Sequence, residues 1–185
     1  MSRKIGSKQY GFHWDYDLLL KLDNILTNLK GGKVLDAGAG DGYTKTFFDD
    51  SWDWSGIDFS PRSEQVKSGD LHNLDFSKNT FDLVLTAAVF EHLHSPWIAM
   101  DNINRVLKPG GYLFGTVAFL EPEHSKSYFH MSQHGIRHLL EISEFNNKEI
   151  TVQNNWTVVN SMNILPSFPL YRNLKSRLVL TLRNS

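Results

Sequence analysis

The feature that most constrains this chain is a set of alternating glycines placed directly after a short apolar segment. Residues 33–36 (Lys-Val-Leu-Asp) have the character of a buried β-strand, and Gly38, Gly40 and Gly42 follow at once. Glycine adopts positive φ angles at little steric cost and lets the backbone approach a ligand closely. A helix that begins after such a turn presents free N–H groups at its start. The pattern therefore predicts a ligand-binding turn between a strand and a helix.

Strands and helices alternate along most of the chain. Apolar spacing and capping residues predict helices at residues 12–29, 43–49, 96–107 and 132–144. Short apolar, β-rich runs predict strands at residues 33–36, 55–59, 65–68, 81–86 and 112–119, with one or two more strands within 149–159. This order predicts an α/β fold in which a doubly wound, mostly parallel sheet lies between two helical layers.

The composition excludes several classes of protein. The 185 residues contain 19 basic and 20 acidic side chains, a balance that argues against a globally basic nucleic-acid binder. The chain has no cysteine, which excludes disulfides, cysteine-ligated zinc and thiolate catalysis. The first residues lack the apolar run of a signal peptide, and no stretch of about 18 apolar residues occurs. We therefore expect a cytoplasmic protein without a transmembrane segment.

The glycine turn is acidic, and this indicates which ligand it suits. A dinucleotide fingerprint would place its third glycine where this chain has Tyr43. Asp36 and Asp41 would add negative charge where a diphosphate has to lie. We therefore expect a ligand with a cationic centre and an ammonium group.

Two further aspartates follow the next two expected strands. Asp58 lies 20 residues after Gly38, where a carboxylate can accept hydrogen bonds from both hydroxyls of a ribose. Asp70 follows Gly69 at the end of the third expected strand and can reach an adenine amino group. The alternative role for both aspartates is to cap turns, which strand-end aspartates commonly do.

Six segments together resemble class I S-adenosylmethionine-dependent methyltransferases of the type 11-like group. They are residues 34–42, 56–60, 69–71, 81–84, 89–93 and 106–111, in the family's order and spacing. The likeness is close over residues 33–119 and loose to about 159. It implies a Rossmann-like fold in a single domain over residues 1–185, with an N-terminal helix or lid (1–32), a cofactor-binding core (33–159) and a basic C-terminal segment (160–185).

The resemblance also implies which residues hold S-adenosylmethionine. The amino-acid end would lie against Asp36 and the backbone of Gly38, Ala39 and Gly40. Asp58 would accept the ribose hydroxyls, and Phe59 would lie beside the adenine. Asp70 and Leu71 would contact the adenine edge. Thr86 and Ala87 would line the methionine side of the cofactor, near the sulfonium. No metal is implied.

The chain departs from the family pattern in two places. Only residues 59–68 lie between Asp58 and Gly69, fewer than a helical crossover between parallel strands needs. We therefore expect the second crossover to be shortened to a turn and the third strand to be rudimentary. The final two strands of the family are only faintly readable, between residues 148 and 164.

Methyl transfer is an in-line displacement at the methyl carbon, so it needs alignment of the acceptor with the sulfonium and, for a poor nucleophile, removal of the acceptor's proton. The loop at residues 120–131 follows the fifth expected strand and supplies His124, Tyr128 and His130, which we expect to handle the acceptor. His92 follows the fourth strand, where a hydrogen-bonded packing role is favoured over that of a base. His134 and His138 are spaced like metal ligands, but a solvated helix face is the favoured reading.

These observations predict an S-adenosylmethionine-dependent methyltransferase that transfers a methyl group to a small-molecule or glycan-type acceptor by direct in-line displacement. A non-catalytic S-adenosylmethionine-binding module is an alternative, because the shortened crossover is compatible with it. An NAD(P)-dependent oxidoreductase is less favoured, because the third glycine is absent and the loop is acidic. No nucleic-acid partner is expected.

The end of the chain is basic. Residues 150–185 contain four basic side chains and no acidic one: Arg172, Lys175, Arg177 and Arg183. Residues 166–185 fit a basic amphipathic helix, and residues 178–182 also fit a strand. This segment could lie on an anionic membrane, contact RNA or cover apolar surface of the chain itself, and packing on the chain itself or a homodimer contact is the default expectation.

Overall fold

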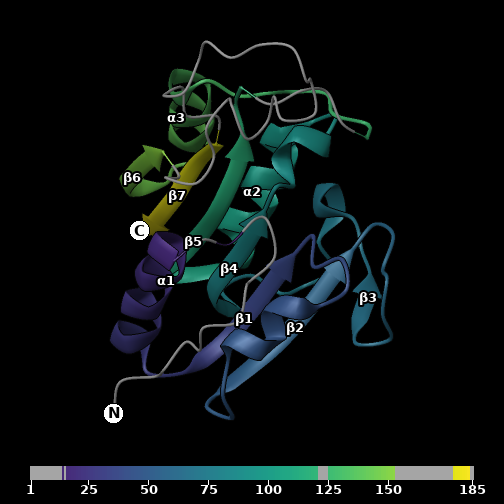
Figure 1. Cartoon of the computed structure of the whole chain (residues 1–185), viewed down its shortest axis with the longest axis vertical. Coiled ribbons are helices and arrows are strands. Elements are labelled where there is room, and N and C mark those ends of the chain that lie inside the picture. Colours follow the sequence, from purple (N-terminus) through teal and green to yellow (C-terminus); the bar gives the residue numbers. More distant parts are fainter. Residues whose placement is uncertain (1–13, 15, 121–124, 153–176, 184–185) are drawn as a thin grey trace, which may run out of the picture.

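A computed structural model of the chain describes residues 14, 16–120, 125–152 and 177–183 (Figure 1). The helices are α1 (Tyr16–Leu29), α2 (Pro96–Val106) and α3 (Gln133–Ile142), and the 3₁₀ turns are η1 (Tyr43–Phe47), η2 (Leu71–Asn73) and η3 (Phe90–His92). The strands are β1 (Gly32–Ala37), β2 (Trp52–Asp58), β3 (Val66–Ser68), β4 (Phe81–Ala87), β5 (Leu107–Ala118), β6 (Asn146–Val152) and β7 (Arg177–Arg183). None of the helices in these ranges combines the length and the apolar character needed to cross a bilayer.

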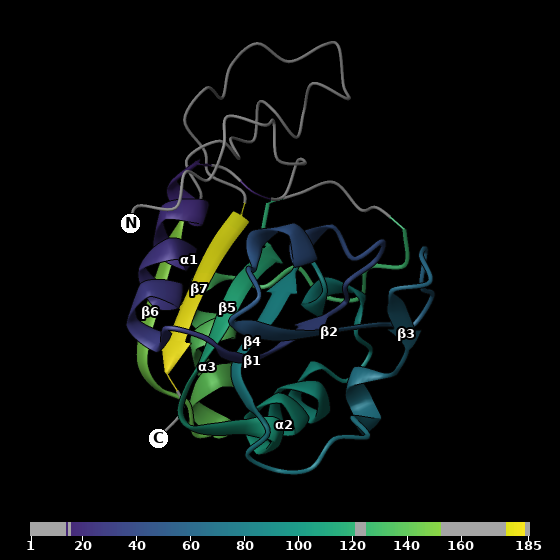
Figure 2. The same ribbon diagram turned by 90° about the horizontal axis from the view of Figure 1, so that it is seen from below.

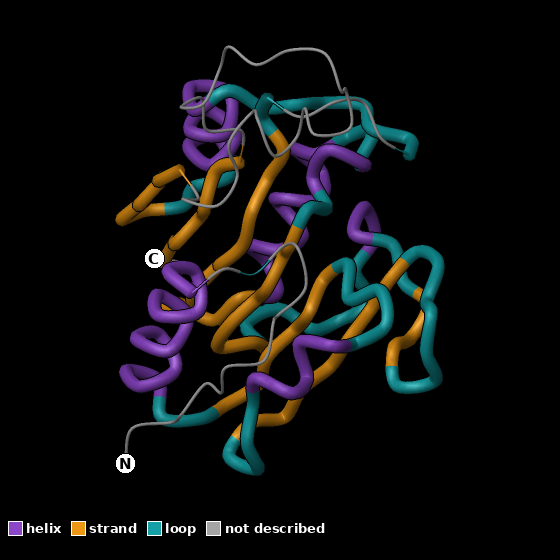
Figure 3. Tube along the Cα trace, in the orientation of Figure 1, coloured by secondary structure: helices purple, strands orange, loops and turns teal. Residues whose placement is uncertain are grey.

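All of the strands belong to one sheet, in the order β3-β2-β1-β4-β5-β7-β6. The strands β3, β2, β1, β4 and β5 are parallel, whereas β7 runs antiparallel to both β5 and β6. The chain first builds outward from β1 to β3 and then returns to place β4 on the other side of β1 (Figure 3). Ligands of open α/β sheets bind at the carboxyl ends of the strands beside such a reversal. The predicted doubly wound α/β fold is confirmed.

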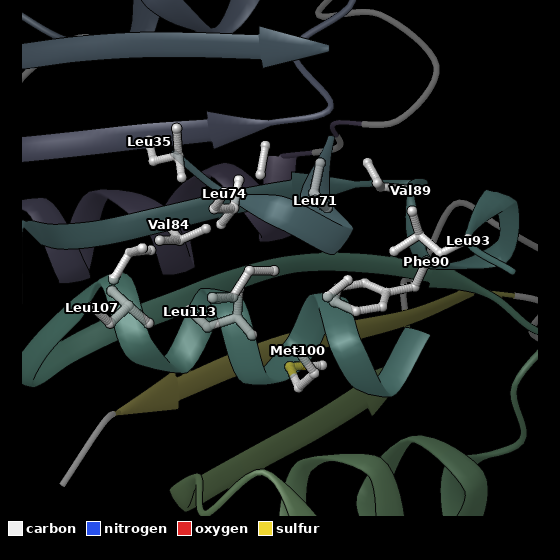
Figure 4. Close-up of a cluster of buried hydrophobic side chains, with 14 of the residues drawn as sticks. Leu35, Leu71, Leu74, Val84, Val89, Phe90, Leu93, Met100, Leu107 and Leu113 are labelled. Atoms are coloured by element: carbon white, nitrogen blue, oxygen red, sulfur yellow. The ribbon is translucent and has the colours of Figure 1, made fainter. Parts of the chain in front are cut away.

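The two faces of the sheet pack against different helices. Figure 2 shows α1 on one face and α2 with α3 on the other. Val34 of β1 belongs to the cluster on the α1 side, whereas the next residue, Leu35, belongs to the cluster on the α2 side; both are fully buried. Figure 4 shows part of the second cluster, including Val84 of the sheet and Met100 of α2. Because both faces are covered, most buried positions of the central strands β1 and β4 are apolar, as is usual for parallel strands.

The connections that follow β1 and β2 are both reduced. The helix expected at residues 43–49 is the five-residue 3₁₀ turn η1, which is consistent with its two threonines and two aromatic residues, all weak helix formers. No helix occurs between Asp58 and Val66, and β3 has three residues. The shortened second crossover and the rudimentary third strand are therefore confirmed.

The end of the chain completes the sheet. β7 lies between β5 and β6, and Val179 is paired with Thr116 on one side and with Thr151 on the other. The strand alternative is therefore confirmed for residues 177–183 and the helix alternative is wrong there, since the apolar run 178–182 suits an interior strand. The last strand also begins well after the expected range of 148–164, so the sheet is not confined to residues 33–159. Residues 166–176 lie outside the described part of the chain.

We expect Gly115→Ala to destabilise the protein strongly. Gly115 of β5 is paired with Thr86 of β4, and a Cβ atom at position 115 would lie 1.7 Å from the Thr86 carbonyl oxygen. No rotamer change relieves a contact between backbone atoms, so the expected loss is about 3 kcal/mol or more of unfolding free energy. Equilibrium urea denaturation measures this loss.

Gly135→Ala is the matched control for that measurement. A Cβ atom at position 135 of α3 would meet only the Ser132 hydroxyl oxygen, at 3.5 Å. Alanine favours helices over glycine, so this change should raise stability by about 0.5 to 1 kcal/mol. Equal stability of the two variants would contradict the strand packing described here.

Candidate functional site

The residues expected to bind a cofactor lie at one edge of the sheet. Parallel pairing places Ala37 of β1 beside Ile57 of β2, and Asp58 beside Ser68 of β3. On the other side of β1, Asp36 is paired with Leu85 of β4. The glycine turn, Asp58, Asp70 and the end of β4 therefore all leave the sheet at its carboxyl edge, beside the reversal between β1 and β4.

The glycine turn needs its glycines for two separate reasons. Gly38, Gly40 and Gly42 have φ angles of 91°, 57° and 79°, a region that costs other residues free energy. In addition, a Cβ atom at Gly38 would lie 2.4 Å from a methyl carbon of Val89, in the connection after β4. The amides of Gly38 and Ala39 both donate to the carbonyl oxygen of Ile57 at 2.9 Å. The turn is therefore held between β2 and the segment that follows β4.

Asp58 ties the end of β2 to this turn. One carboxylate oxygen accepts from the amide of Gly40 at 2.8 Å, and the other accepts from the amide of Ser60 at 2.8 Å. These contacts are those of the turn-capping role, which is the alternative expected for Asp58 from the sequence. The side chain is half-buried at the edge of the sheet, so its oxygens lie where a ligand on the glycine turn would meet them.

The shortened crossover folds back onto the glycine turn. The amide of Arg62 donates to the carbonyl oxygen of Gly40 at 2.9 Å. The hydroxyl of Ser63 and the amide nitrogen of the Gln65 side chain both donate to the carbonyl oxygen of Asp41, at 2.7 and 3.0 Å. Sequence reasoning missed all three supporting residues, and only the shortness of the crossover pointed to this segment.

Asp36 is almost completely buried, at 2% exposure, and receives a hydrogen bond from the hydroxyl of Thr44. That hydroxyl oxygen in turn accepts from the indole N–H of Trp54 at 3.3 Å. Burial raises the pKa of Asp36 to about 7; the Thr44 hydrogen bond opposes this rise, and the negative charges of Asp58 and Asp41 add to it. A cationic group bound nearby would favour the ionised form, so this carboxyl group suits a positively charged ligand. Thr44 and Trp54 were not predicted.

Asp70 begins the 3₁₀ turn η2 as its capping residue. One oxygen of its carboxylate accepts from the backbone amide of His72 at 2.9 Å and lies 2.7 Å from Nδ1 of the same histidine. Burial alone would raise the pKa of Asp70, but the hydrogen bonds and charge of His72 outweigh it and hold this pKa below its usual value. Phe59 is 83% exposed at the end of β2, whereas Leu71 is buried in the core.

The end of β4 turns sharply. Thr86 is fully buried and Ala87 is half-buried, so of these two side chains only that of Ala87 reaches the surface of the edge. Ala88 has a φ angle of 56°, and its amide donates to the carbonyl and hydroxyl oxygens of Thr116 at 3.1 and 3.2 Å. A non-glycine residue in this region stores strain of about 1 kcal/mol or more, and such strain is common beside ligand sites. Ala88 was not predicted.

The segment expected to handle the acceptor is anchored on η3. The amides of Tyr128 and Phe129 donate to the carbonyl oxygen of Glu91 at 2.6 and 3.3 Å. Nδ1 of His92 lies 3.2 Å from the carbonyl oxygen of Lys126, a contact that agrees with a packing role for His92. Tyr128 is 49% exposed and His130 is half-buried, whereas His124 lies outside the described residues.

The histidine pair with metal-ligand spacing stays on the surface. His134 and His138 are both exposed on α3. Within the part of the chain that the structure covers, no three histidine or acidic side chains are grouped as metal ligands would be.

Comparison with known proteins identifies the family. A family model that describes methyltransferase domains matches residues 12–161, most of the chain. The chain belongs to the class I S-adenosylmethionine-dependent methyltransferases. S-adenosylmethionine is therefore its cofactor.

One relative of this methyltransferase matches only a short segment, and two solved structures have a similar fold at low sequence identity. An uncharacterized methyltransferase of Schizosaccharomyces pombe is 47% identical over 45 residues, which are 24% of this chain and only 16% of that protein. An S-adenosylmethionine-dependent methyltransferase of Mesorhizobium loti has a similar fold, with a TM-score of 0.64 and 14% identity over 83% of this chain and 92% of that one. Phosphoethanolamine N-methyltransferase 2 of Haemonchus contortus, solved with S-adenosylhomocysteine, gives a TM-score of 0.61 and 17% identity over 88% of this chain and 52% of that one.

We expect Asp36→Asn to change how the stability of this methyltransferase depends on pH. Asparagine keeps an oxygen that accepts from Thr44 but cannot ionise. Because the pKa of Asp36 is higher in the folded chain than its ordinary value of 3.8, the natural protein loses stability as pH rises from about 4 to about 7. Relative to the natural protein, the variant should therefore gain on the order of a few kcal/mol across this window.

Urea denaturation at several pH values between 4 and 8 checks this expectation. Thr44→Val removes the hydrogen bond that favours the ionised form, so with Asp36 intact it should move the loss to higher pH. Parallel stability curves for Asp36→Asn and the natural protein would contradict the burial of an ionisable group at position 36.

Proposed function

We propose that this chain is an enzyme that transfers a methyl group from S-adenosylmethionine to a small-molecule or glycan-type acceptor by direct in-line displacement. The observation that carries the proposal is the acidic glycine turn at the sheet reversal, where the buried Asp36 and the half-buried Asp58 both lie. A cofactor with a sulfonium and an ammonium group suits this set of carboxyl groups, whereas a diphosphate does not.

In the proposed binding mode, each part of the cofactor meets a separate element of the edge. The amino-acid end lies against Asp36 and the turn at residues 38–40, and Asp58 accepts the ribose hydroxyls. Phe59 offers an exposed ring to the adenine, and Leu71 supports the turn below it. We assign the adenine amino group to the oxygen of Asp70 that does not face His72. The backbone of Thr86, and not its buried hydroxyl, lines the methionine side of the cofactor together with Ala87.

The chemical step forms a bond from the acceptor to the methyl carbon and breaks the bond from that carbon to sulfur. S-adenosylmethionine supplies the methyl group on a positively charged sulfur. An acceptor hydroxyl or amine also gives up a proton. We assign its handling to Tyr128 and His130, on the segment anchored to Glu91, and to His124, which lies outside the described residues. Most of the rate enhancement in such a displacement comes from alignment of the two reacting groups.

The cofactor assignment predicts selective binding of S-adenosylhomocysteine. Calorimetric titration should give one site for S-adenosylhomocysteine and no heat of binding for NADH. Asp58→Ala should weaken S-adenosylhomocysteine about tenfold or more, because the ribose hydroxyls lose a charged acceptor. Binding of NADH alone would overturn the methyltransferase proposal and favour the oxidoreductase alternative.

Two controls separate ribose recognition from damage to the glycine turn. Asp53→Ala removes an exposed carboxylate at the start of the same strand, 3.7 Å from the ammonium group of Lys33, and should leave the affinity within twofold. An S-adenosylhomocysteine analogue without ribose hydroxyls should bind the natural protein and Asp58→Ala equally. If Asp58→Ala weakens this analogue as much as it weakens S-adenosylhomocysteine, Asp58 acts only by holding the turn.

The acceptor assignment predicts that His130→Ala lowers turnover without weakening the cofactor. A panel of phenols, amines and sugars with methyl-labelled S-adenosylmethionine identifies an acceptor. With that acceptor, kcat should fall by about tenfold or more, because a positioned base contributes at least that much. The affinity for S-adenosylhomocysteine should stay within twofold. An unchanged kcat would remove His130 from acceptor handling, and no methyl transfer at all would favour the non-catalytic binding module.

A further inference from the structure

Four ring-bearing side chains form an exposed cluster, which we call the aromatic patch: His94, Trp97, Tyr128 and Phe129. Trp97, Tyr128 and Phe129 are exposed by 46%, 49% and 40%. The rings of Trp97 and Phe129 lie 6.3 Å apart at 65°, and those of His94 and Tyr128 lie 6.2 Å apart at 79°. Both pairs are edge-to-face, an arrangement that leaves ring faces open for a further aromatic group.

The aromatic patch is held in place before any ligand arrives. Tyr128 and Phe129 are fixed through their amides to the carbonyl oxygen of Glu91. His94 lies 2.9 Å from the Ser95 hydroxyl through Nδ1 and is stacked on His72, with ring centres 4.1 Å apart. A ligand that binds to such a preformed surface loses little free energy to the ordering of side chains.

The aromatic patch is also continuous with the proposed cofactor site. Trp97 lies in the first turn of α2, after the carboxyl end of β4, and Tyr128 and Phe129 lie after the carboxyl end of β5. A row of contacts joins the patch to Asp70: the carboxylate contacts His72, the His72 ring is stacked on His94, and His94 contacts Tyr128. An acceptor that docks here would therefore lie on the same edge as the cofactor.

The size and chemistry of the aromatic patch favour a small aromatic ligand. Three large side chains exposed by 40 to 49% offer on the order of 300 Å², well below the roughly 800 Å² that each partner contributes to a stable protein interface. A sugar needs polar groups beside the rings, but the Ser95 hydroxyl is already in contact with His94, and Nδ1 of His72 with Asp70. The patch itself carries few polar atoms, namely the Tyr128 hydroxyl, the Trp97 indole N–H and Nε2 of His94, and the rest of its surface is ring.

We propose that the aromatic patch is the docking surface for the acceptor, and that the acceptor is a small molecule with an aromatic ring. This inference rests on the proposed function, because it places the ring beside the edge that we assign to the cofactor. The ring is held by contacts with Trp97 and Phe129 instead of by charge. The substrate class is thereby narrowed from small molecules and glycans in general to aromatic small molecules.

Paired ligands of the same size and different ring character test the inference. The full chain is titrated by calorimetry with 1-naphthol, with its saturated analogue decahydro-1-naphthol and with methyl β-glucoside, with and without saturating S-adenosylhomocysteine. 1-Naphthol should bind at least fivefold more tightly than the other two ligands. Trp97→Ala and Phe129→Ala should each weaken 1-naphthol at least fivefold, and Trp97→Phe should restore most of the loss.

Tyr16→Ala is the matched control, because it removes a 72% exposed ring on α1 and should leave the affinity for 1-naphthol within twofold. Failure of 1-naphthol to bind, equal binding of decahydro-1-naphthol or the glucoside, or unchanged affinity in both patch variants would overturn the inference. The proposed function fails separately, if the natural protein does not bind S-adenosylhomocysteine in the same titrations; the 1-naphthol results stay readable in that case.

Discussion

The position of β1 between β2 and β4 is the constraint on which the rest of the structure depends. Two parallel neighbours and two covered faces bury the last four residues of β1, and the chain leaves the sheet directly after them. The chain leaves this crowded point through residues with positive φ angles, and Val89 leaves no room for a Cβ atom at Gly38. The carbonyl oxygen of Ile57 then accepts two amides of the turn, so the shape of the ligand site follows directly from the way the sheet is built.

The same burial gives the site its electrostatic character. A carboxyl group at the end of a covered strand loses its hydration, and the nearby charges of Asp58 and Asp41 add to this effect; Thr44 offsets only part of it. Trp54 then supports Thr44, and its ring lies over Gly56, where a Cβ atom would be 2.2 Å from it. Gly56 therefore affects the charge state of Asp36 indirectly, because it leaves room for the indole ring of Trp54 that contacts Thr44.

The sequence predicted what depends on periodicity and on local chemistry. The alternation of strands and helices, the glycine turn and the shortened crossover all follow from short-range patterns, and the structure has them. Contacts between distant segments were not predictable: no pattern in the chain links Trp54 to Thr44, Ser63 to Asp41, or Tyr128 to Glu91. The strand at residues 177–183 was ambiguous for the same reason, because its partners β5 and β6, and not its own composition, decide its conformation.

The absence of an α-helix after β1 and after β2 explains which residues support the glycine turn. In this chain the connection after β1 is the 3₁₀ turn η1 and the connection after β2 has no helix, so neither connection contains an α-helix. Side chains supply the missing support, because Ser63 and Gln65 hold the carbonyl oxygen of Asp41 and Trp54 fills the space beside Thr44. We propose that acceptor recognition falls to the segments that follow β4 and β5, where the aromatic patch lies.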